Sequence, residues 1–129
     1  MTSSEEGPGI LVVEDEWMIA EAIASALADA GYVVVGPAGR LSEAVALATG
    51  TALSAALLDI QLEKGMYVYP VANILAERQI PFAFVSSHPP EQIDEAYRDR
   101  PHFRKPFQPE ALVGFLADLL GEPQSVAQG

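Results

Sequence analysis

Two apolar runs of this chain end in acidic residues, and this pattern constrains the fold more than any other. Residues 10–13 stop at Glu14-Asp15-Glu16, and residues 55–58 stop at Asp59. Strands that are apolar along their whole length are buried on both faces, as in parallel sheets. The carboxyl ends of parallel strands meet at one edge, where such sheets bind ligands. The sequence therefore predicts that two groups of carboxylates lie together at that edge.

Carboxylates packed this closely repel each other, and each resists ionisation unless a positive charge lies between them. Hard divalent cations prefer carboxylate and carbonyl oxygens as ligands. The sequence therefore predicts a site for such a cation beside Asp59.

Composition limits the classes of partner. The chain has 129 residues, of which 50% are hydrophobic, and this is enough for the core of one domain. Its 18 acids against 7 Lys and Arg give a net charge of -11, which repels nucleic acids and anionic lipids. Cysteine is absent, and no apolar run approaches the ~20 residues that span a bilayer. We expect a cytoplasmic protein that binds neither nucleic acid nor membrane.

The two ends of the chain are polar and lack apolar periodicity. We therefore predict flexible tails at residues 1–8 and 121–129 and a folded domain at 9–120. The first tail has neither the basic start nor the apolar centre of a signal peptide. We expect the domain to act alone, without an output domain.

Apolar runs alternate with helical apolar periods along the domain. They predict strands at 10–13, 32–35, 55–58, 81–85 and 102–104, and helices at 16–30, 41–48, 68–78, 89–99 and 108–120. Gly36-Pro37 is expected to close the second strand, and Pro70 to mark the secure start of the third helix. Regular alternation of strand and helix predicts a parallel sheet covered by helices on both faces.

Chemically distinctive residues stand at the ends of these strands, namely Glu14 with Asp15, Asp59, Ser86 and Lys105. In this order and at these intervals, the set resembles the receiver domain of bacterial two-component response regulators, in its stand-alone form. The resemblance covers roughly residues 9–120. It implies a flavodoxin-like, doubly wound (βα)5 fold with strand order 2-1-3-4-5.

The resemblance implies a role for each acid. Asp59 would accept a phosphoryl group from a sensor histidine kinase or a histidine phosphotransfer protein. Asp15 and Asp59 would bind Mg²⁺ directly, Glu14 through water, and Gln61 through its backbone carbonyl. Such a protein is a phosphoacceptor that promotes its own phosphorylation and dephosphorylation rather than an enzyme with a separate substrate. It signals within a phosphorelay through protein contacts.

Lys105 and Ser86 would complete the site, since phosphoryl transfer requires fixed positive charge and hydrogen bonds on the equatorial oxygens. Lys105 would supply the charge, aimed by a cis bond to Pro106, and Ser86 the hydroxyl. His88, two residues past Ser86, stands where the family, together with the Gln61 position, controls the access of water to the phosphoryl group.

The chain departs from the family at the ring that usually responds to phosphorylation. That ring, Tyr or Phe, stands three residues before the lysine, and here the position holds His102, followed by Phe103. The sequence leaves open whether His102 or a neighbour takes over this switching role. Partners of the family bind near the fourth helix, fifth strand and last helix, so Tyr97, His102 and Phe107 are expected on or near that surface.

Each motif also has an ordinary explanation: paired acids can start a helix, and a lysine before proline is commonly a surface residue. Only their combination favours the receiver interpretation. A haloacid-dehalogenase-type phosphatase would need a second acid at position 61, which holds Gln61. A flavin binder would be repelled by the acids at 14–16. A pseudo-receiver that signals without phosphorylation, and a phosphate sink, stay open. We expect a monomer or a weak homodimer.

Overall fold

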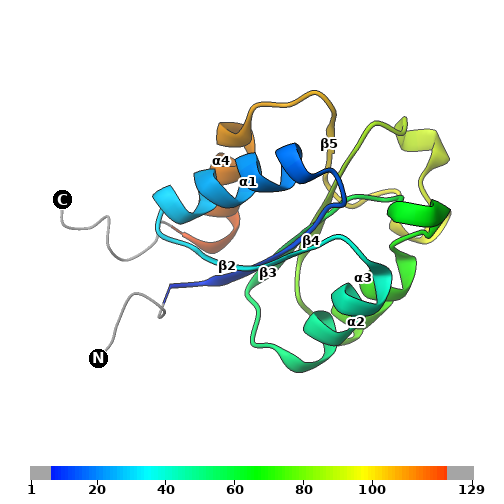
Figure 1. Cartoon of the computed structure of the whole chain (residues 1–129), viewed down its shortest axis with the longest axis horizontal. Helices are drawn as coiled ribbons and strands as arrows, with labels where there is room; N and C mark the ends of the chain where they lie inside the picture. The colour runs from blue at the N-terminus through cyan, green and yellow to red at the C-terminus, as the bar shows by residue number, and fades with distance from the viewer. Residues whose placement is uncertain (1–6, 122–129) are drawn as a thin grey trace.

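The structure is a computed structural model that describes residues 7–121 of the chain (Figure 1). The predicted tails at 1–8 and 121–129 lie almost entirely outside the described residues. Five parallel strands form one sheet in the order β2-β1-β3-β4-β5. They are β1 Gly9–Val13, β2 Val33–Ala38, β3 Ala55–Leu58, β4 Phe82–Ser86 and β5 His102–Arg104. The flavodoxin-like strand order predicted from the sequence is confirmed.

Helices cover both faces of this sheet (Figure 1). They are α1 Trp17–Asp29, α2 Leu41–Gly50, α3 Tyr69–Glu77 and α4 Pro109–Leu120. Successive residues of a strand point to opposite faces, which divides the core into two clusters. Ile10 and Val12 of β1 pack in the cluster that includes residues of α1 and α4, whereas Leu11 and Val13 pack in the one that includes residues of α2 and α3.

The predicted helix at 89–99 is wrong. This segment instead forms two short 3-10 turns, Pro90–Gln92 and Glu95–Tyr97. Two consecutive prolines remove backbone donors at its start and restrict the residue before each of them. Asp94 then accepts a hydrogen bond from the backbone N–H of Ala96, which starts the second turn locally. The described residues therefore contain four α-helices, and the pattern of five strand–helix pairs is incomplete.

Strand β2 does not stop at Gly36-Pro37 as predicted but continues to Ala38, with a shift of register opposite β1. Gly36 has a φ of 99°, and a Cβ there would lie 2.9 Å from the carbonyl oxygen of Val12. Only glycine fits this approach. The continuation lets the Ala38 carbonyl accept a hydrogen bond of 2.9 Å from the N–H of Glu14.

In the part of the chain that the structure describes, every helix falls short of the length and apolarity that crossing a bilayer requires.

Candidate functional site

The predicted site residues gather at the carboxyl edge of the sheet. Glu14 and Asp15 follow β1, Asp59 follows β3, Ser86 ends β4 and Lys105 follows β5. Backbone pairing continues past the strand ends, because the N–H of Asp59 donates to the Val13 carbonyl at 2.8 Å and that of Lys105 to the Ser86 carbonyl at 2.9 Å. These bonds fix the backbone positions from which the side chains of Asp59 and Lys105 extend.

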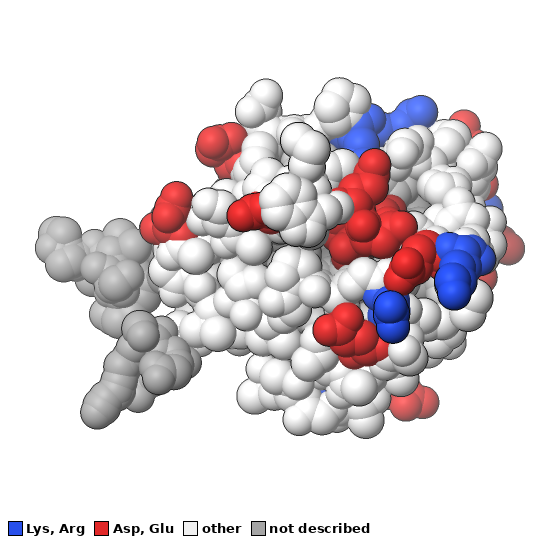
Figure 2. Space-filling view, in the orientation of Figure 1, with Lys and Arg blue, Asp and Glu red and all other residues white. Residues whose placement is uncertain are grey.

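Three carboxylates meet at this edge. Oxygen atoms of Glu14, Asp15 and Asp59 all lie within 4.8 Å of one another, a spacing that a single cation can bridge. Glu14 and Asp59 are buried, with exposed fractions of 3% and 7%, whereas Asp15 is open to solvent. Figure 2 shows acidic side chains gathered beside the start of α1, with basic groups next to them. The donor set suits a hard divalent ion.

Burial makes the inner acids reluctant to ionise. Desolvation and the charge of Asp59 raise the pKa of Glu14 to about 7, against the opposing effects of the Glu16 N–H and Lys105. Burial likewise raises the pKa of Asp59, although Lys105 opposes it. Oε1 of Glu14 lies 3.0 Å from the Lys105 ammonium, but this ion pair lacks the geometry of a hydrogen bond. A bound cation would offset the cost of ionising Glu14 and Asp59 and would give Oε1 of Glu14 a further partner. The residues present therefore fit a metal ion.

Lys105 is the cation that these acids share. Its Nζ lies 3.0 Å from Glu14 Oε1, 3.0 Å from Glu16 Oε1 and 3.4 Å from Asp59 Oδ2. Burial lowers the pKa of Lys105, but its contacts with Glu14 and Glu16 and the charge of Asp59 outweigh burial and raise it overall. The site therefore favours the charged ammonium form of Lys105. Its bond to Pro106 is cis, as the resemblance implies.

Glu16 is a further residue of the site that its position in the sequence does not reveal. It is the last acid of the run that follows β1, and position alone assigned it to the start of α1. The structure instead directs its carboxylate to Lys105, 89 positions away. Only the spatial neighbourhood of Lys105 reveals this contact.

A hollow of about 540 Å³, which we call the acidic pocket, opens at this edge. Among the residues that line it are Asp15, Asp59, Gln61, His88 and Lys105. Gln61 and His88 therefore border the space in front of Asp59. Whether the Gln61 carbonyl binds a metal stays a prediction.

Ser86 lies at the expected strand end, but its hydroxyl is engaged elsewhere. The side chain is fully buried, and its Oγ accepts a hydrogen bond of 3.0 Å from the N–H of His88. The neighbouring Ser87, rather than Ser86, borders the acidic pocket. Accepting this bond leaves the Ser86 O–H able to donate, so the predicted contact with a phosphoryl group requires only that the hydroxyl reach the acidic pocket, which Ser86 does not line.

His102 sits in β5 opposite Phe84 of β4. Its buried Nε2 has no hydrogen-bond partner among the described residues. Burial, together with the neighbouring Arg104 and His88, lowers the pKa of His102 and so disfavours its charged form. Tyr97, His102 and Phe107, expected on a partner surface, are each only half exposed. Their role in binding partners stays a prediction.

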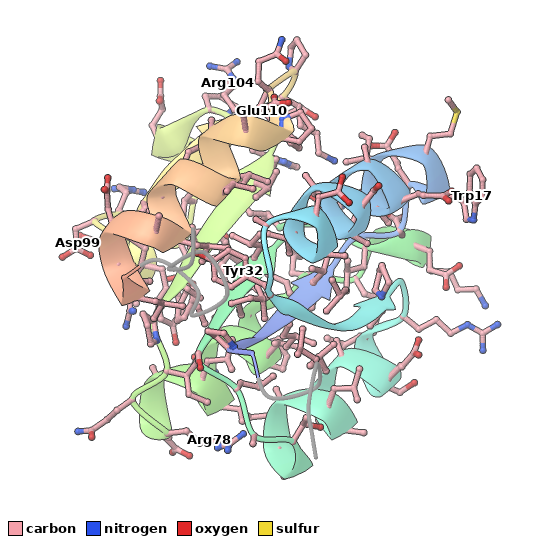
Figure 3. The ribbon with its side chains drawn as sticks, turned by 90° about the vertical axis from the view of Figure 1, so that its left-hand side faces the viewer. Trp17, Tyr32, Arg78, Asp99, Arg104 and Glu110 are labelled. Atoms are coloured by element: carbon pink, nitrogen blue, oxygen red, sulfur yellow. The ribbon has the colours of Figure 1, made fainter. Side chains whose placement is uncertain are left out.

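Two large apolar side chains are exposed to solvent beside the acidic pocket. Trp17 and Met18, in the first turn of α1, have exposed fractions of 73% and 76%. Figure 3 shows Trp17 projecting into solvent, with Asp99 on the opposite side of the view.

Comparison with known proteins places this geometry in context. No family model matches the chain. It is 32% identical over 120 residues to the phyllosphere-induced regulator PhyR of Methylorubrum extorquens, covering 90% of this chain and 45% of that regulator. The chain thus spans about half the length of this relative.

Solved structures match over nearly their whole length. SdrG from Sphingomonas melonis Fr1 is 35% identical with a TM-score of 0.76, over 92% of this chain and 99% of SdrG. A response regulator receiver protein from Sinorhizobium medicae is 25% identical with a TM-score of 0.76, over 89% and 95% of the two chains. The receiver domain of the Pseudomonas aeruginosa kinase PA1611, with magnesium in its active-site cleft, shares the fold at 22% identity and a TM-score of 0.71, over 90% and 99%.

Proposed function

The chain belongs to the receiver domains of response regulators, and on this premise we propose that Asp59 accepts a phosphoryl group from a histidine kinase or a histidine phosphotransfer protein. One observation carries the proposal: a buried strand-end carboxylate lies in a cluster with two further acids and within 3.4 Å of the Lys105 ammonium. This arrangement joins a nucleophile to the charges that its reaction needs.

The proposed step exchanges one bond to phosphorus for another. An oxygen of the Asp59 carboxylate forms the new O–P bond while the P–N bond of the donor phosphohistidine breaks. The electron pair stays on the imidazole nitrogen, which then takes up a proton. In hydrolysis, a water oxygen bonds to phosphorus, the Asp59 O–P bond breaks, and inorganic phosphate leaves with both protons of the water.

Glu14, Asp15 and Asp59 would hold Mg²⁺, with the Gln61 carbonyl as a further oxygen ligand. When bound, the ion supplies positive charge that offsets the repulsion between a carboxylate and a phosphoryl dianion. Lys105 holds its ammonium against the same oxygens, and this charge stabilises the loose transition state of the transfer. The Ser86 hydroxyl, which can accept from the His88 N–H and still donate, supplies a hydrogen bond to another phosphoryl oxygen.

The product signals because it adds about 1.5 to 2 negative charges and new acceptor oxygens to one strand end. We propose that the protein acts in the cytoplasm of a bacterium and contacts other proteins in both states. Trp17 and Met18 give a donor protein an apolar surface next to the acidic pocket.

Incubation with Mg²⁺ and acetyl phosphate, followed by intact mass measurement, tests this function. We expect a gain of one phosphoryl group in the wild type, no gain with a chelator, and no gain in Asp59→Asn. Asp99→Asn removes the same charge from an exposed position before β5, whereas Lys105 of the site follows β5, and this variant should behave as wild type.

Phosphorylation of Asp59→Asn to the wild-type level would refute the assignment of the acceptor. No gain in the wild type with acetyl phosphate or with a phosphorylated kinase would favour a pseudo-receiver. A phosphate sink differs from a switch in that phosphorylation leaves the chemical shifts of β5 and α4 unchanged.

A further inference from the structure

The carboxylate of Glu16 contacts a residue outside its own helix. It is the N-cap residue of α1, yet its side chain makes no capping hydrogen bond. Its Oε1 instead accepts a hydrogen bond of 3.0 Å from Lys105 Nζ, across the mouth of the acidic pocket. A helix start leaves backbone N–H groups unsatisfied, so an acid at this position would ordinarily turn to its own helix. In the structure, the Glu16 carboxylate contacts the Lys105 ammonium instead of the N–H groups of α1.

The contact also separates two hollows. Glu16, Ser87 and Lys105 border both the acidic pocket and a neighbouring groove of about 510 Å³, which Met18 and Phe107 line as well. The ion pair between α1 and the residue after β5 therefore forms part of the wall between them.

The ammonium of Lys105 has three donors, and three carboxylates already surround it. A phosphoryl group on Asp59 would bring further oxygens that need the same donors. The phosphoryl oxygens then compete with the existing partners for the same ammonium. The side chains of Glu14 and Asp59 are 1% and 9% exposed, so loss of the cation would leave a buried charge uncompensated. The side chain of Glu16 is 61% exposed, and water can replace its partner.

We propose that Glu16 is a positioning residue that holds the Lys105 ammonium in the resting state and competes with the phosphoryl group for it. This inference rests on the proposed function of Asp59. Two consequences follow. In the resting protein, Glu16 keeps part of the lysine charge away from an arriving phosphodonor. In the phosphorylated protein, it draws the ammonium away from the phosphoryl oxygens.

Glu16→Gln removes the charge while keeping the size of an exposed side chain. We expect acetyl phosphate to phosphorylate this variant about two- to fivefold faster than wild type, and the aspartyl phosphate to last longer by a similar factor. Glu77→Gln, at the exposed end of α3, removes the same charge far from Lys105 and should leave both rates unchanged.

A double-mutant cycle with Lys105→Ala separates competition for the lysine from general charge repulsion. Lys105→Ala will itself slow phosphorylation. The measured quantity is therefore the phosphorylation rate of the Glu16→Gln/Lys105→Ala double variant divided by that of Lys105→Ala. We expect this ratio to fall to that of Glu77→Gln. An undiminished effect of Glu16→Gln without Lys105 would refute the proposed competition.

A second measurement needs neither metal nor phosphodonor. The chain has only two lysines, Lys64 and Lys105, so ¹⁵N-lysine labelling gives a simple ammonium spectrum. We expect the Lys105 signal to shift and exchange faster with water in Glu16→Gln, with Lys64 as the internal reference. An unchanged Lys105 signal would overturn the inference. Failure of the wild type to become phosphorylated would instead overturn the proposed function, and the two failures are thus distinguishable.

Discussion

The ring of Tyr97 stacks on the ring of Tyr69, with centroids 6.1 Å apart and an interplanar angle of 10°. This contact attaches the segment between β4 and β5 to α3. The Tyr97 hydroxyl donates to the side chain of Asn73, and the Tyr69 hydroxyl accepts a hydrogen bond of 2.9 Å from the N–H of Asp94. Stacking and hydrogen bonds thus hold in place a segment that has no α-helix of its own.

Tyr97→Ala should therefore destabilise the protein by about 1–3 kcal/mol, because it removes the stack and the edge contacts of Tyr97 with Phe82 and Phe84. Tyr97→Phe keeps the ring and should cost less than about 1 kcal/mol. Urea unfolding gives both values, and amide exchange should show faster opening of residues 90–100 in Tyr97→Ala alone. Equal costs for the two variants would mean that the hydroxyl, rather than the stack, anchors the segment.

The metal site should depend on Asp15, the exposed member of the acid cluster. Asp15→Asn should weaken Mg²⁺ binding by roughly tenfold or more, since it removes a charged oxygen ligand. Titration followed by Trp17 fluorescence or calorimetry measures this change. Asp29→Asn, at the other end of α1, is the control for charge and should bind as wild type does. Equal affinity in all three proteins would place the ion elsewhere.

Stability without metal should fall as the pH rises from about 4.5 to 7. The pKa of Glu14 is raised to about 7 in the folded protein, from 4.5, so the folded state binds the proton more tightly than the unfolded state does. This contribution is fully present below the unfolded pKa and is lost as the pH passes through the folded value. Thermal unfolding in a chelator, from pH 4.5 to 8, checks the slope.

Glu14→Gln is the matched variant for that slope. The amide cannot ionise, so we expect a weaker pH dependence and a higher melting temperature than wild type at pH 7.5. Saturating Mg²⁺ should raise the melting temperature of the wild type toward that of Glu14→Gln, because the ion compensates the charge of Glu14. A steeper slope in Glu14→Gln would show that another group, such as Asp59, dominates the dependence.

The lifetime of the aspartyl phosphate should respond to His88, which borders the acidic pocket. From this position the imidazole can orient the attacking water or block its path. We expect the dephosphorylation rate of His88→Ala to differ from that of wild type at a fixed pH. His88 also donates its backbone N–H to Ser86, which alanine preserves. Equal dephosphorylation rates in the two proteins would leave His88 without a role in the chemistry.

The sheet and the acid cluster could be predicted because both follow from local pattern. Apolar runs that end at Asp15 and Asp59 define buried strands, and parallel pairing then brings their ends together. The conformation of residues 89–99 could not be predicted, because it depends on consecutive prolines and on a stack with Tyr69 that forms only after folding. The partner of Glu16 was inaccessible for a similar reason, since Lys105 is distant in sequence.

The continuation of β2 past Gly36 ties the first acid of the cluster to the outermost strand of the sheet. Glu14 is held through its N–H by the Ala38 carbonyl, and Ala38 reaches that position only because Gly36 lets the chain pass close to Val12. The alignment of the carboxylates therefore depends on a residue that carries no side chain and contacts no ligand. Any larger residue at position 36 would alter the affinity of the site for a metal ion, although the residues that carry the carboxylates stay the same.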